Sequence, residues 1–305
     1  MTAGALVIGH GSIGARHARL LRELGCRTAV VSRRGTKEHP AYGSLDEALG
    51  SESPEYVVVA NETARHVSTL EALARAGFEG RVLVEKPLAS AGGALPAHRF
   101  EAAFVGYQLR LHPVLRALRS RLAGQRVISA QAYVGQYLPD WRPGTDYRAS
   151  YSARADLGGG VLRDLSHELD YLAWFFGTWR RLAALGGRLS RLEIDSDDCW
   201  GVLLAFPDCP VATLQLNYLD RPGRRELVVV TDDHTYRADL IRAELTCDGE
   251  SEAFEIGRDD LLLAEHRAAL GEGGAELCNL EEGLAVVETV AAIERAAESG
   301  TWVER

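Results

Sequence analysis

Short apolar runs of strand length alternate with amphipathic segments over the first 110 residues of the chain. The strand-like runs lie at residues 5–9, 28–32, 56–60, 81–85 and 102–107. The helix-like segments lie at residues 12–24, 44–49, 66–76 and 92–99. Strands and helices in this alternation predict right-handed crossovers and a doubly wound parallel sheet. We therefore expect an N-terminal α/β domain over residues 1–112.

The pattern changes in the remainder of the chain, residues 113–305. Helices are predicted at 114–122, 161–176 and 280–299, the last one ending at Gly300. Strand-like runs lie at residues 126–134, 182–189, 199–206, 211–218, 226–231 and 235–240. Consecutive strands joined by tight turns are antiparallel. This half is therefore expected to be an α+β domain with a mostly antiparallel, open sheet.

Composition and charge exclude several partners. A chain of 305 residues can form two domains with cores of their own. The net charge of -9 argues against nucleic acid or an anionic membrane, because both require a basic surface. No apolar run approaches the roughly 18 residues of a membrane span, and the first strand pattern begins at once, without the basic and apolar regions of a signal peptide. We expect a cytoplasmic protein.

Cysteine and lysine usage add two constraints. The five cysteines are scattered, form no Cys-x-x-Cys pair and stand beside no histidine at metal-ligand spacing. We therefore expect reduced thiols and no metal site. Of the 34 basic residues only Lys37 and Lys86 are lysines, so a lysine inside a motif is informative here.

A glycine motif joins the first strand to the first helix. It reads Gly9-His10-Gly11-Ser12-Ile13-Gly14. Gly9 permits a tight turn, Gly11 lets the backbone approach a pyrophosphate, and Gly14 allows close packing of helix on strand. The helix N-terminus, at Ser12 and Ile13, supplies free N–H groups for the phosphates. This context predicts a Rossmann-type dinucleotide site, the alternative being a glycine-rich turn without a ligand.

The second strand ends at Ser32-Arg33-Arg34. An NAD site usually has a carboxylate here for the ribose 2′-hydroxyl, and this sequence has none. A hydroxyl followed by two guanidinium groups suits a 2′-phosphate, because arginine binds phosphate in a forked geometry. NADP is therefore the preferred cofactor, with NAD as the alternative if these arginines only form a solvated strand end.

The fourth strand ends at Glu85-Lys86-Pro87, where ligands bind in parallel sheets. Lys86 could donate to the nicotinamide carboxamide or to a substrate hydroxyl, or transfer a proton. The alternative is an ordinary strand-end lysine.

The helix predicted at 161–176 has two different faces. The apolar face holds Leu162, Leu165, Leu169, Leu172 and Phe176. The opposite face holds Asp164, His167 and Tyr171, with Trp174 and Phe175 at its edges, and is expected to line a closed pocket. His167 is suited to accept a hydroxyl proton, and Asp164 to orient it or to hold the substrate. The alternative is a capping aspartate and a structural histidine.

Residues 135–152 form an irregular stretch rich in aromatic side chains. Tyr137, Trp141, Tyr147 and Tyr151 offer flat faces for a sugar ring, and Arg142 and Arg148 lie among them. Such a loop near a catalytic helix is expected to form a substrate wall. The alternative is a surface loop packed on its own aromatic residues.

Five segments together resemble one enzyme family. They are the Glu85-Lys86-Pro87 motif and residues 59–66 (VANETARH), 105–113 (VGYQLRLHP), 158–167 (GGGVLRDLSH) and 282–284 (EGL). Nearly the whole chain is thereby similar to the glucose-fructose oxidoreductase / inositol dehydrogenase / MocA family. The resemblance implies cofactor contacts from Ala60, Asn61, His66, Glu85, Lys86 and Gln108. It also implies catalysis by Lys86, His167 and Asp164, and a homodimer or homotetramer formed through the open sheet.

One departure from the family pattern concerns the pair Asp164 and His167. Many members have three residues between these positions, and here only Leu165 and Ser166 separate them. The shorter spacing resembles members that act on amino sugars or nucleotide-linked sugars. The predicted reaction is hydride transfer between a sugar carbinol carbon and the nicotinamide, in a biosynthetic pathway. The rivals are an NAD-dependent glycosidase that recycles its cofactor and a non-catalytic, cofactor-sensing regulator.

Overall fold

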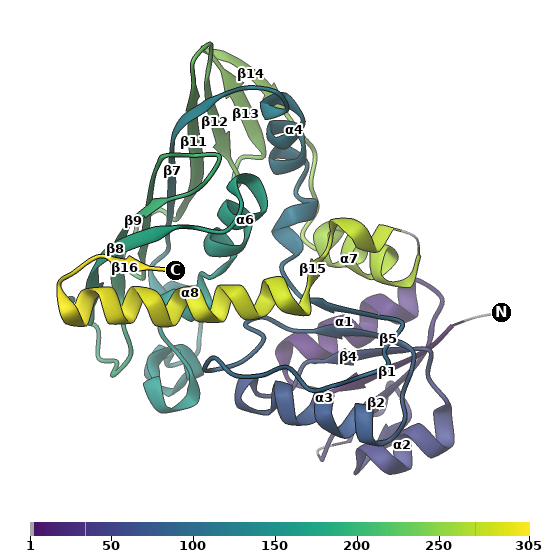
Figure 1. The fold of residues 1–305 in the computed structure, drawn as a ribbon. Helices are drawn as coiled ribbons and strands as arrows, with labels where there is room; N and C mark the ends of the chain where they lie inside the picture. The colour runs from purple at the N-terminus through teal and green to yellow at the C-terminus, as the bar shows by residue number, and fades with distance from the viewer. Residues whose placement is uncertain (1–2, 34, 272) are drawn as a thin grey trace. The chain divides into compact units, whose positions relative to one another are not determined.

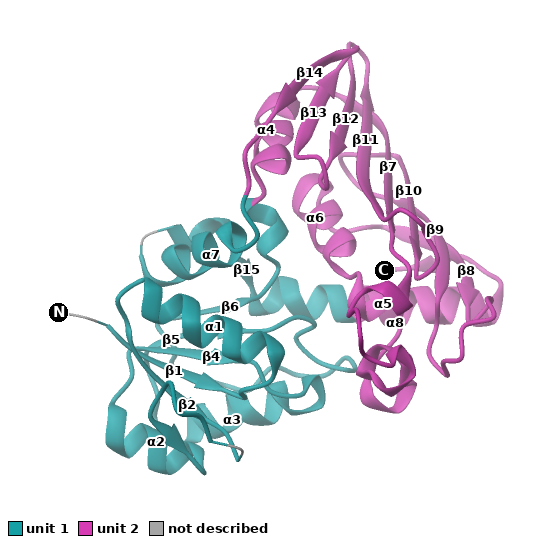
Figure 2. Cartoon of the chain, turned by 180° about the vertical axis from the view of Figure 1, so that it is seen from behind, with its two compact units in different colours: residues 1–111, 257–287 teal, residues 112–256, 288–305 magenta. Residues whose placement is uncertain are grey.

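The computed structural model describes residues 3–33, 35–271 and 273–305. Its contacts divide the chain into two compact units (Figure 2). The first comprises the described residues up to Leu111 together with Gly257–Val287, and the second comprises His112–Ile256 and Glu288–Arg305. The sequence pattern places residues 257–287 in the second domain. They lie in the first unit because α7 (Asp260–Leu270) packs on α1 (Ser12–Glu23) and β15 (Cys278–Asn279) pairs with β6 (Ala102–Val105).

The first unit contains the predicted parallel sheet, with seven strands in the described residues (Figure 1). Their order is β15-β6-β5-β4-β1-β2-β3, and all pairs are parallel except β15 with β6. The remaining strands are β1 (Gly4–Ile8), β2 (Arg27–Val31), β3 (Ala41–Tyr42), β4 (Tyr56–Val59) and β5 (Arg81–Val84). The apolar runs β1 and β4 are buried along their whole length, as expected for central strands of a parallel sheet.

Helices α1, α2 (Leu45–Glu52), α3 (His66–Arg75) and α7 belong to the first unit. The start of α2 follows from its sequence, because the Ser44 hydroxyl accepts a hydrogen bond from the Glu47 N–H and two acidic residues occupy the first turn. The predicted helix at 92–99 is wrong, since this segment has no regular structure. Gly92, Gly93 and Pro96 disfavour a helix there.

The second unit contains a sheet of nine strands in its described residues, in the order β14-β13-β12-β11-β7-β10-β9-β8-β16. The strands are β7 (Val127–Gly135), β8 (Arg181–Gly187), β9 (Cys199–Ala205), β10 (Val211–Asn217), β11 (Arg224–Thr231), β12 (Thr235–Asp239), β13 (Glu244–Cys247), β14 (Glu250–Ala253) and β16 (Val303–Glu304). All pairs are antiparallel except β7 with β10. The predicted mostly antiparallel sheet is confirmed.

Burial alternates along β9 and β10, so one face of this sheet is covered and the other is open. Helices α4 (Pro113–Leu122) and α6 (His167–Phe176) pack against strands of the sheet. Leu185, Leu203 and Val211 are exposed on β8, β9 and β10. The open sheet that the sequence predicts is therefore present.

The predicted helix at 161–176 is interrupted. It forms α5 (Val161–Asp164) and α6, because Leu165 leaves the helical conformation at φ -103° and ψ 32°. The last helix, α8 (Leu280–Ser299), ends before Gly300, which has a φ of +64°. Short 3₁₀ helices occupy η1 (Thr63–Arg65), η2 (Gln108–Leu111), η3 (Leu138–Asp140), η4 (Tyr147–Ala149), η5 (Tyr151–Ala153), η6 (Ala155–Leu157) and η7 (Gly273–Glu276). Within the described ranges, none of the helices has the length and apolar character required to cross a bilayer.

A buried ion pair fixes α6 on the sheet of the second unit. The Glu168 carboxylate is completely buried and accepts hydrogen bonds from Nε and Nη2 of Arg225 on β11, at 2.8 and 3.1 Å. Such a forked pair compensates a carboxylate that has lost its water. Glu168 is therefore part of the packing of α6 and not of a solvated face.

We expect Arg225→Met to lower the free energy of unfolding by about 3–5 kcal/mol, because Glu168 would stay buried without its guanidinium. Urea unfolding measures this change. Arg224→Met is the matched control, since that side chain is half exposed, and it should cost less than about 1 kcal/mol. Equal losses in the two variants would contradict the assignment.

Candidate active site

The predicted cofactor residues lie at one edge of the parallel sheet. Gly9 follows β1, Ser32 follows β2, Ala60 follows β4, and Glu85 and Lys86 follow β5. Because parallel strands end on the same side, these positions meet at the carboxyl edge of the sheet. Gln108, at the start of η2 after β6, is half-buried at the same end of its strand. The first unit therefore brings these predicted residues together.

The three glycines of the first turn are required for different reasons. Gly9 has a φ of +96°, and an added Cβ would lie 2.6 Å from the Ala60 carbonyl oxygen. An added Cβ at Gly14 would lie 2.1 Å from the Gly9 carbonyl oxygen. At Gly11, by contrast, a Cβ would meet no atom of the described residues within 4 Å. Packing within the protein thus accounts for Gly9 and Gly14, while Gly11 leaves open space beside the turn.

This open space suits the phosphates of a dinucleotide. Helix α1 begins at Ser12, which is exposed, followed by the half-buried Ile13. Its first turn carries no acidic residue, so the positive end of the helix is uncompensated by the chain there. The residues present therefore fit a pyrophosphate group at Gly11.

The end of β2 is accessible. Ser32 is half-buried and its backbone N–H donates to the Tyr42 carbonyl oxygen at 3.0 Å. The Arg33 side chain is exposed, and Arg34 lies outside the described residues. An exposed guanidinium beside a hydroxyl at this strand end is compatible with the predicted 2′-phosphate.

His66 connects the loop after β4 to the segment after β5. Its ring nitrogens lie 3.0 Å from the Pro87 carbonyl oxygen and 3.2 Å from the Asn61 carbonyl oxygen. Burial lowers the pKa of His66. The Asn61 amide nitrogen donates to Thr69 at 2.9 Å, whereas its buried Oδ1 accepts no hydrogen bond from the described chain. His66 therefore shapes the loop, and Asn61 retains an acceptor for a ligand.

Glu85 and Lys86 form the end of β5. The Glu85 carboxylate accepts a hydrogen bond from the Lys86 backbone N–H at 3.0 Å and lies 2.8 Å from Nε2 of His17 on α1. Burial raises the pKa of Glu85, but the hydrogen bond from His17 and the charge of Lys86 outweigh it, so that this pKa lies below its ordinary value. The half-buried Lys86 side chain therefore lies next to an ionised carboxylate.

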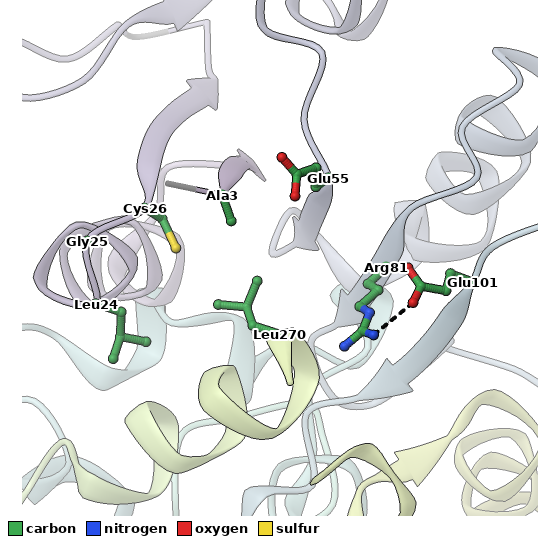
Figure 3. Close-up of a pocket in the computed structure, with 8 residues that line it drawn as sticks. All are labelled: Ala3, Leu24, Gly25, Cys26, Glu55, Arg81, Glu101 and Leu270. Carbon is green, nitrogen blue, oxygen red and sulfur yellow. Dashed lines mark hydrogen bonds and ion pairs between the residues drawn. The ribbon is translucent and has the colours of Figure 1, made fainter. Parts of the chain in front are cut away.

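A hollow of about 700 Å³ in the first unit lies elsewhere (Figure 3). Ala3, Cys26 and Glu55 precede β1, β2 and β4, Arg81 begins β5, and Glu101 precedes β6. These lining residues mark the amino ends of the parallel strands, which form the opposite edge of the sheet. The hollow is therefore separate from the predicted cofactor site.

In the second unit, the glycine run before α5 is required by packing. An added Cβ at Gly159 would lie 2.1 Å from the Tyr151 carbonyl oxygen, and one at Gly160 would lie 2.0 Å from Oδ1 of Asp197. The Asp197 carboxylate accepts a hydrogen bond from the Leu162 N–H at 3.0 Å, so it caps α5 from a distant part of the chain. Burial raises the pKa of Asp197.

Two phenols hold the predicted catalytic aspartate. Tyr151 donates to Oδ1 of Asp164 at 2.5 Å, and Tyr218, directly after β10, donates to Oδ2 at 2.6 Å. Asp164 and Tyr218 are buried, and burial together with Asp164 raises the pKa of Tyr218 well above its ordinary value. His167, the first residue of α6, is also buried. Tyr218 is not predictable from the local sequence pattern, because its link to α5 arises only in the folded chain.

The aromatic loop separates into two groups. Trp141 packs edge-to-face on Tyr218, with ring centroids 5.2 Å apart, and so joins Tyr151 near Asp164. Tyr137 instead lies beneath the Arg221 guanidinium, and the Tyr147 hydroxyl accepts a hydrogen bond from the Glu193 N–H at 3.3 Å. The contacts described therefore link Trp141 and Tyr151 to the aspartate, and they tie Tyr137 and Tyr147 to other segments.

The structure also shows the surroundings of Tyr171 on α6 and of the cysteines. Tyr171 is completely buried and packs edge-to-face on Phe175. The five cysteines are free thiols. His234, Cys247 and Asp248 bring three potential ligand atoms within 4.8 Å of one another, but His234 and Asp248 are already paired with each other at 2.7 Å on exposed turns.

A doubly wound sheet with a glycine turn, a strand-end lysine and a second α+β unit defines a nicotinamide-dependent oxidoreductase of the two-domain Rossmann class. Family comparison gives the same class. Residues 4–98 match the oxidoreductase family with an NAD-binding Rossmann fold, and residues 116–237 match the GFO/IDH/MocA C-terminal domain. The chain belongs to the glucose-fructose oxidoreductase / inositol dehydrogenase / MocA family.

Solved structures share this fold over the full chain. GenD2 from gentamicin A biosynthesis, in complex with NAD, is 25% identical, with a TM-score of 0.81, covering 100% of this chain and 96% of that chain. Levoglucosan dehydrogenase in complex with NADH is 16% identical, with a TM-score of 0.84, covering 100% and 99%. UDP-N-acetylglucosamine 3-dehydrogenase GnnA from Acidithiobacillus ferrooxidans is 20% identical, with a TM-score of 0.77, covering 98% and 99%. No curated protein sequence matches the chain.

We expect Gly11→Ala to weaken NAD(P) binding by at least about tenfold while leaving the stability of the protein unchanged to within about 0.5 kcal/mol. The added methyl group would enter the open space and meet only the ligand. Gly14→Ala is the contrasting variant, because its Cβ meets the backbone and should destabilise the fold by about 1–3 kcal/mol. Fluorescence titration and thermal unfolding measure the two effects. Unchanged cofactor affinity in Gly11→Ala would refute the phosphate assignment.

Tyr218→Phe should lower the free energy of unfolding by about 1–3 kcal/mol, because one oxygen of the buried Asp164 carboxylate loses its donor. Urea unfolding gives the value. Tyr137→Phe is the control, since its ring stacks under Arg221 and the substitution keeps the ring. If both phenylalanine variants are as stable as the wild type, the phenols do not hold Asp164.

Proposed function

We propose that the chain transfers hydride reversibly between a carbinol carbon of a sugar or nucleotide-linked sugar and a nicotinamide cofactor. The observation that carries this proposal is Lys86, one of only two lysines, beside an ionised Glu85 at the carboxyl edge that also holds the open glycine turn. Bound nicotinamide supplies the hydride acceptor or donor. The chain itself has to bind the sugar, orient its hydroxyl and take up the hydroxyl proton.

In this proposal, Lys86 and His167 are the groups that exchange the hydroxyl proton of the substrate. When the carbinol is oxidised, its carbon loses a hydride and its oxygen loses a proton, which one of these two bases accepts. The Lys86 ammonium can also donate to the developing oxygen. Asp164 is assigned to hold the substrate or orient His167, and the Tyr151 and Tyr218 phenols fix the carboxylate in one orientation for that role.

NADP is the proposed cofactor. The end of β2 carries Ser32 and an exposed Arg33 where an NAD site has a carboxylate, and Arg34 follows in the sequence. GenD2 and levoglucosan dehydrogenase were solved with NAD and NADH, which keeps NAD as the alternative.

The proposed substrate class rests on the neighbours and on the aromatic residues near Asp164. Levoglucosan and UDP-N-acetylglucosamine are the substrates in the names of two similar structures, and GenD2 belongs to gentamicin A biosynthesis. Trp141 and Tyr151 offer ring faces against which a sugar can stack. We assign these two residues to the substrate wall ahead of Tyr137 and Tyr147.

Self-association is part of the same proposal. The open face of the second sheet exposes Leu185, Leu203 and Val211 on three neighbouring strands. Contiguous apolar surface of this kind is usually covered by a partner. We therefore propose a cytoplasmic homodimer or homotetramer that uses this face.

Lys86→Met should reduce kcat by about 10²–10⁴-fold, because the group that exchanges the hydroxyl proton is removed. The control is Lys37→Met, the other lysine, which is exposed and should retain full activity. Net absorbance of the reduced nicotinamide, measured with NADP or NAD and a panel of sugars and sugar nucleotides, gives the rates.

Each rival predicts a different outcome of this assay. A glycosidase that recycles its cofactor produces no net absorbance change. A regulator keeps its biological activity in Lys86→Met. Binding of NAD about tenfold more tightly than NADP would show that the assignment of Ser32, Arg33 and Arg34 to a 2′-phosphate is wrong.

A further inference from the structure

A chain of hydrogen bonds runs through the core of the first unit to Glu85. The Tyr56 hydroxyl lies 3.1 Å from Nδ1 of His266, and Nε2 of His266 lies 2.9 Å from Nδ1 of His17. Nε2 of His17 lies 2.8 Å from Oε1 of Glu85. The four residues come from β4, α7, α1 and the end of β5, so the folding of the whole unit is needed to assemble them.

Water does not compete for these groups. The side chains of Tyr56, His266 and His17 are completely buried, and that of Glu85 is 12% exposed. A buried polar atom without a partner costs about 1–3 kcal/mol, so every donor in the chain needs an acceptor inside the protein. The chain is therefore a defined network and not a chance contact of two histidines.

The order of donors follows from elementary bonding rules. An ionised Glu85 can only accept, so Nε2 of His17 donates to it. With both imidazoles neutral, Nδ1 of His17 accepts from Nε2 of His266, and Nδ1 of His266 accepts from the Tyr56 hydroxyl. With His17 protonated, its Nδ1 donates to Nε2 of His266, and Nδ1 of His266 donates to the Tyr56 oxygen. In either order each of these contacts has one donor and one acceptor, and Glu85 receives its hydrogen bond from His17.

We propose that this Tyr56–His266–His17 chain holds the Glu85 carboxylate ionised and in place beside Lys86, which makes His17 and His266 positioning residues for Lys86. The part that concerns catalysis rests on the proposed function. The hydrogen-bond network itself depends only on the packing of the first unit. The proposed hydride transfer assigns no step to these histidines, whose side chains are completely buried.

The surroundings of Glu85 explain why a donor is required. Lys86 is adjacent in the chain, His17 faces it from α1 and His66 acts on it electrostatically from α3. Directly after β6, an added Cβ at Gly106 would lie 3.4 Å from Oε2 of Glu85, so this residue contributes backbone and no charge there. Burial is the largest influence on the pKa of Glu85 and acts upward, and the hydrogen bond and electrostatic interaction with His17, together with Lys86, bring this pKa below its ordinary value. Burial and the adjacent His17 keep the pKa of His266 well below its ordinary value, consistent with a neutral second ring.

The test compares His17→Leu with His17→Gln in the protein without cofactor or substrate. The amide nitrogen of glutamine stands as many bonds from Cα as Nε2 of histidine, so His17→Gln keeps a donor for Glu85 and His17→Leu does not. Both variants lack the imidazole, so its own titration cancels in the comparison. Urea unfolding between about pH 4 and pH 8 gives the unfolding equilibrium constant of each.

The two variants should have opposite slopes. In His17→Gln the Glu85 pKa stays below its unfolded value, so stability rises with pH as Glu85 ionises and then levels off. In His17→Leu burial raises this pKa above the unfolded value, so stability is lost as pH rises through it, by up to about tenfold in the unfolding constant per pH unit. Parallel curves for the two variants would overturn the proposal.

A second pair keeps the test decisive if His17→Leu does not fold. His266→Leu removes the hydrogen-bond partner that fixes the His17 ring, and His266→Gln retains one, so the same difference in slope is expected with smaller size. Identical curves for this pair would also overturn the proposal.

Activity provides the separate readout for Lys86. At neutral pH, kcat/KM of His17→Leu should be at least about tenfold below that of His17→Gln and should recover as pH rises and Glu85 ionises. If the stability curves differ as expected but no form shows dehydrogenase activity, the proposed function is wrong, while the proposed role of the hydrogen-bond network in ionising Glu85 is retained. If the enzyme is active and the stability curves are parallel, the proposed role of the hydrogen-bond network is wrong, while the proposed function is retained. Equal activity of the two variants at all pH values would remove the assignment of His17 as a positioning residue.

Discussion

The predicted cofactor site at the carboxyl edge of the parallel sheet depends on one contact, in which the backbone of the turn after β1 packs directly on the backbone of its neighbours. Gly14 approaches the Gly9 carbonyl so closely that a side chain there would force the backbone to shift, and Gly9 in turn lies against Ala60. This contact holds the start of α1 against the ends of β1 and β4. Because the strands are parallel, the same edge then receives Glu85 and Lys86 from β5. The predicted cofactor residues of the first unit are thus brought together beside a turn that requires glycine at positions 9 and 14.

The second unit uses the same device for another purpose. Gly159 and Gly160 bring the start of α5 against the backbone near Tyr151 and against Asp197. This close approach places Asp164 one turn further on, where phenols from η5 and from the end of β10 reach both of its oxygens. Because the helix is interrupted after Asp164, His167 begins the new helix α6 and does not continue α5. The glycines position the aspartate without contacting it.

Residue spacing predicts those parts of the site that are local in sequence. The glycine turn, the lysine at the end of β5 and the change from a parallel to an antiparallel sheet are all encoded within short segments. Tyr218 is 54 positions from Asp164 and His266 is 249 positions from His17, so periodicity carries no information about either pair. The return of residues 257–287 to the first unit has the same origin, since it depends on α7 fitting α1. Local propensity also misled at residues 92–99, where glycines and a proline outweigh the apolar spacing.

The two carboxylates near the predicted chemistry, Glu85 and Asp164, show how burial and donors together determine charge. Each is largely withdrawn from water, and burial raises the pKa of Glu85. Asp164 receives hydrogen bonds directly from two phenols, Tyr151 and Tyr218, and Tyr151 is one of the two residues proposed for the substrate wall. Glu85 receives an imidazole whose own partner lies on α7, so the charge beside Lys86 depends on a helix from the far end of the chain. A change in α7 can therefore alter the chemistry at β5 without altering any residue that touches a ligand.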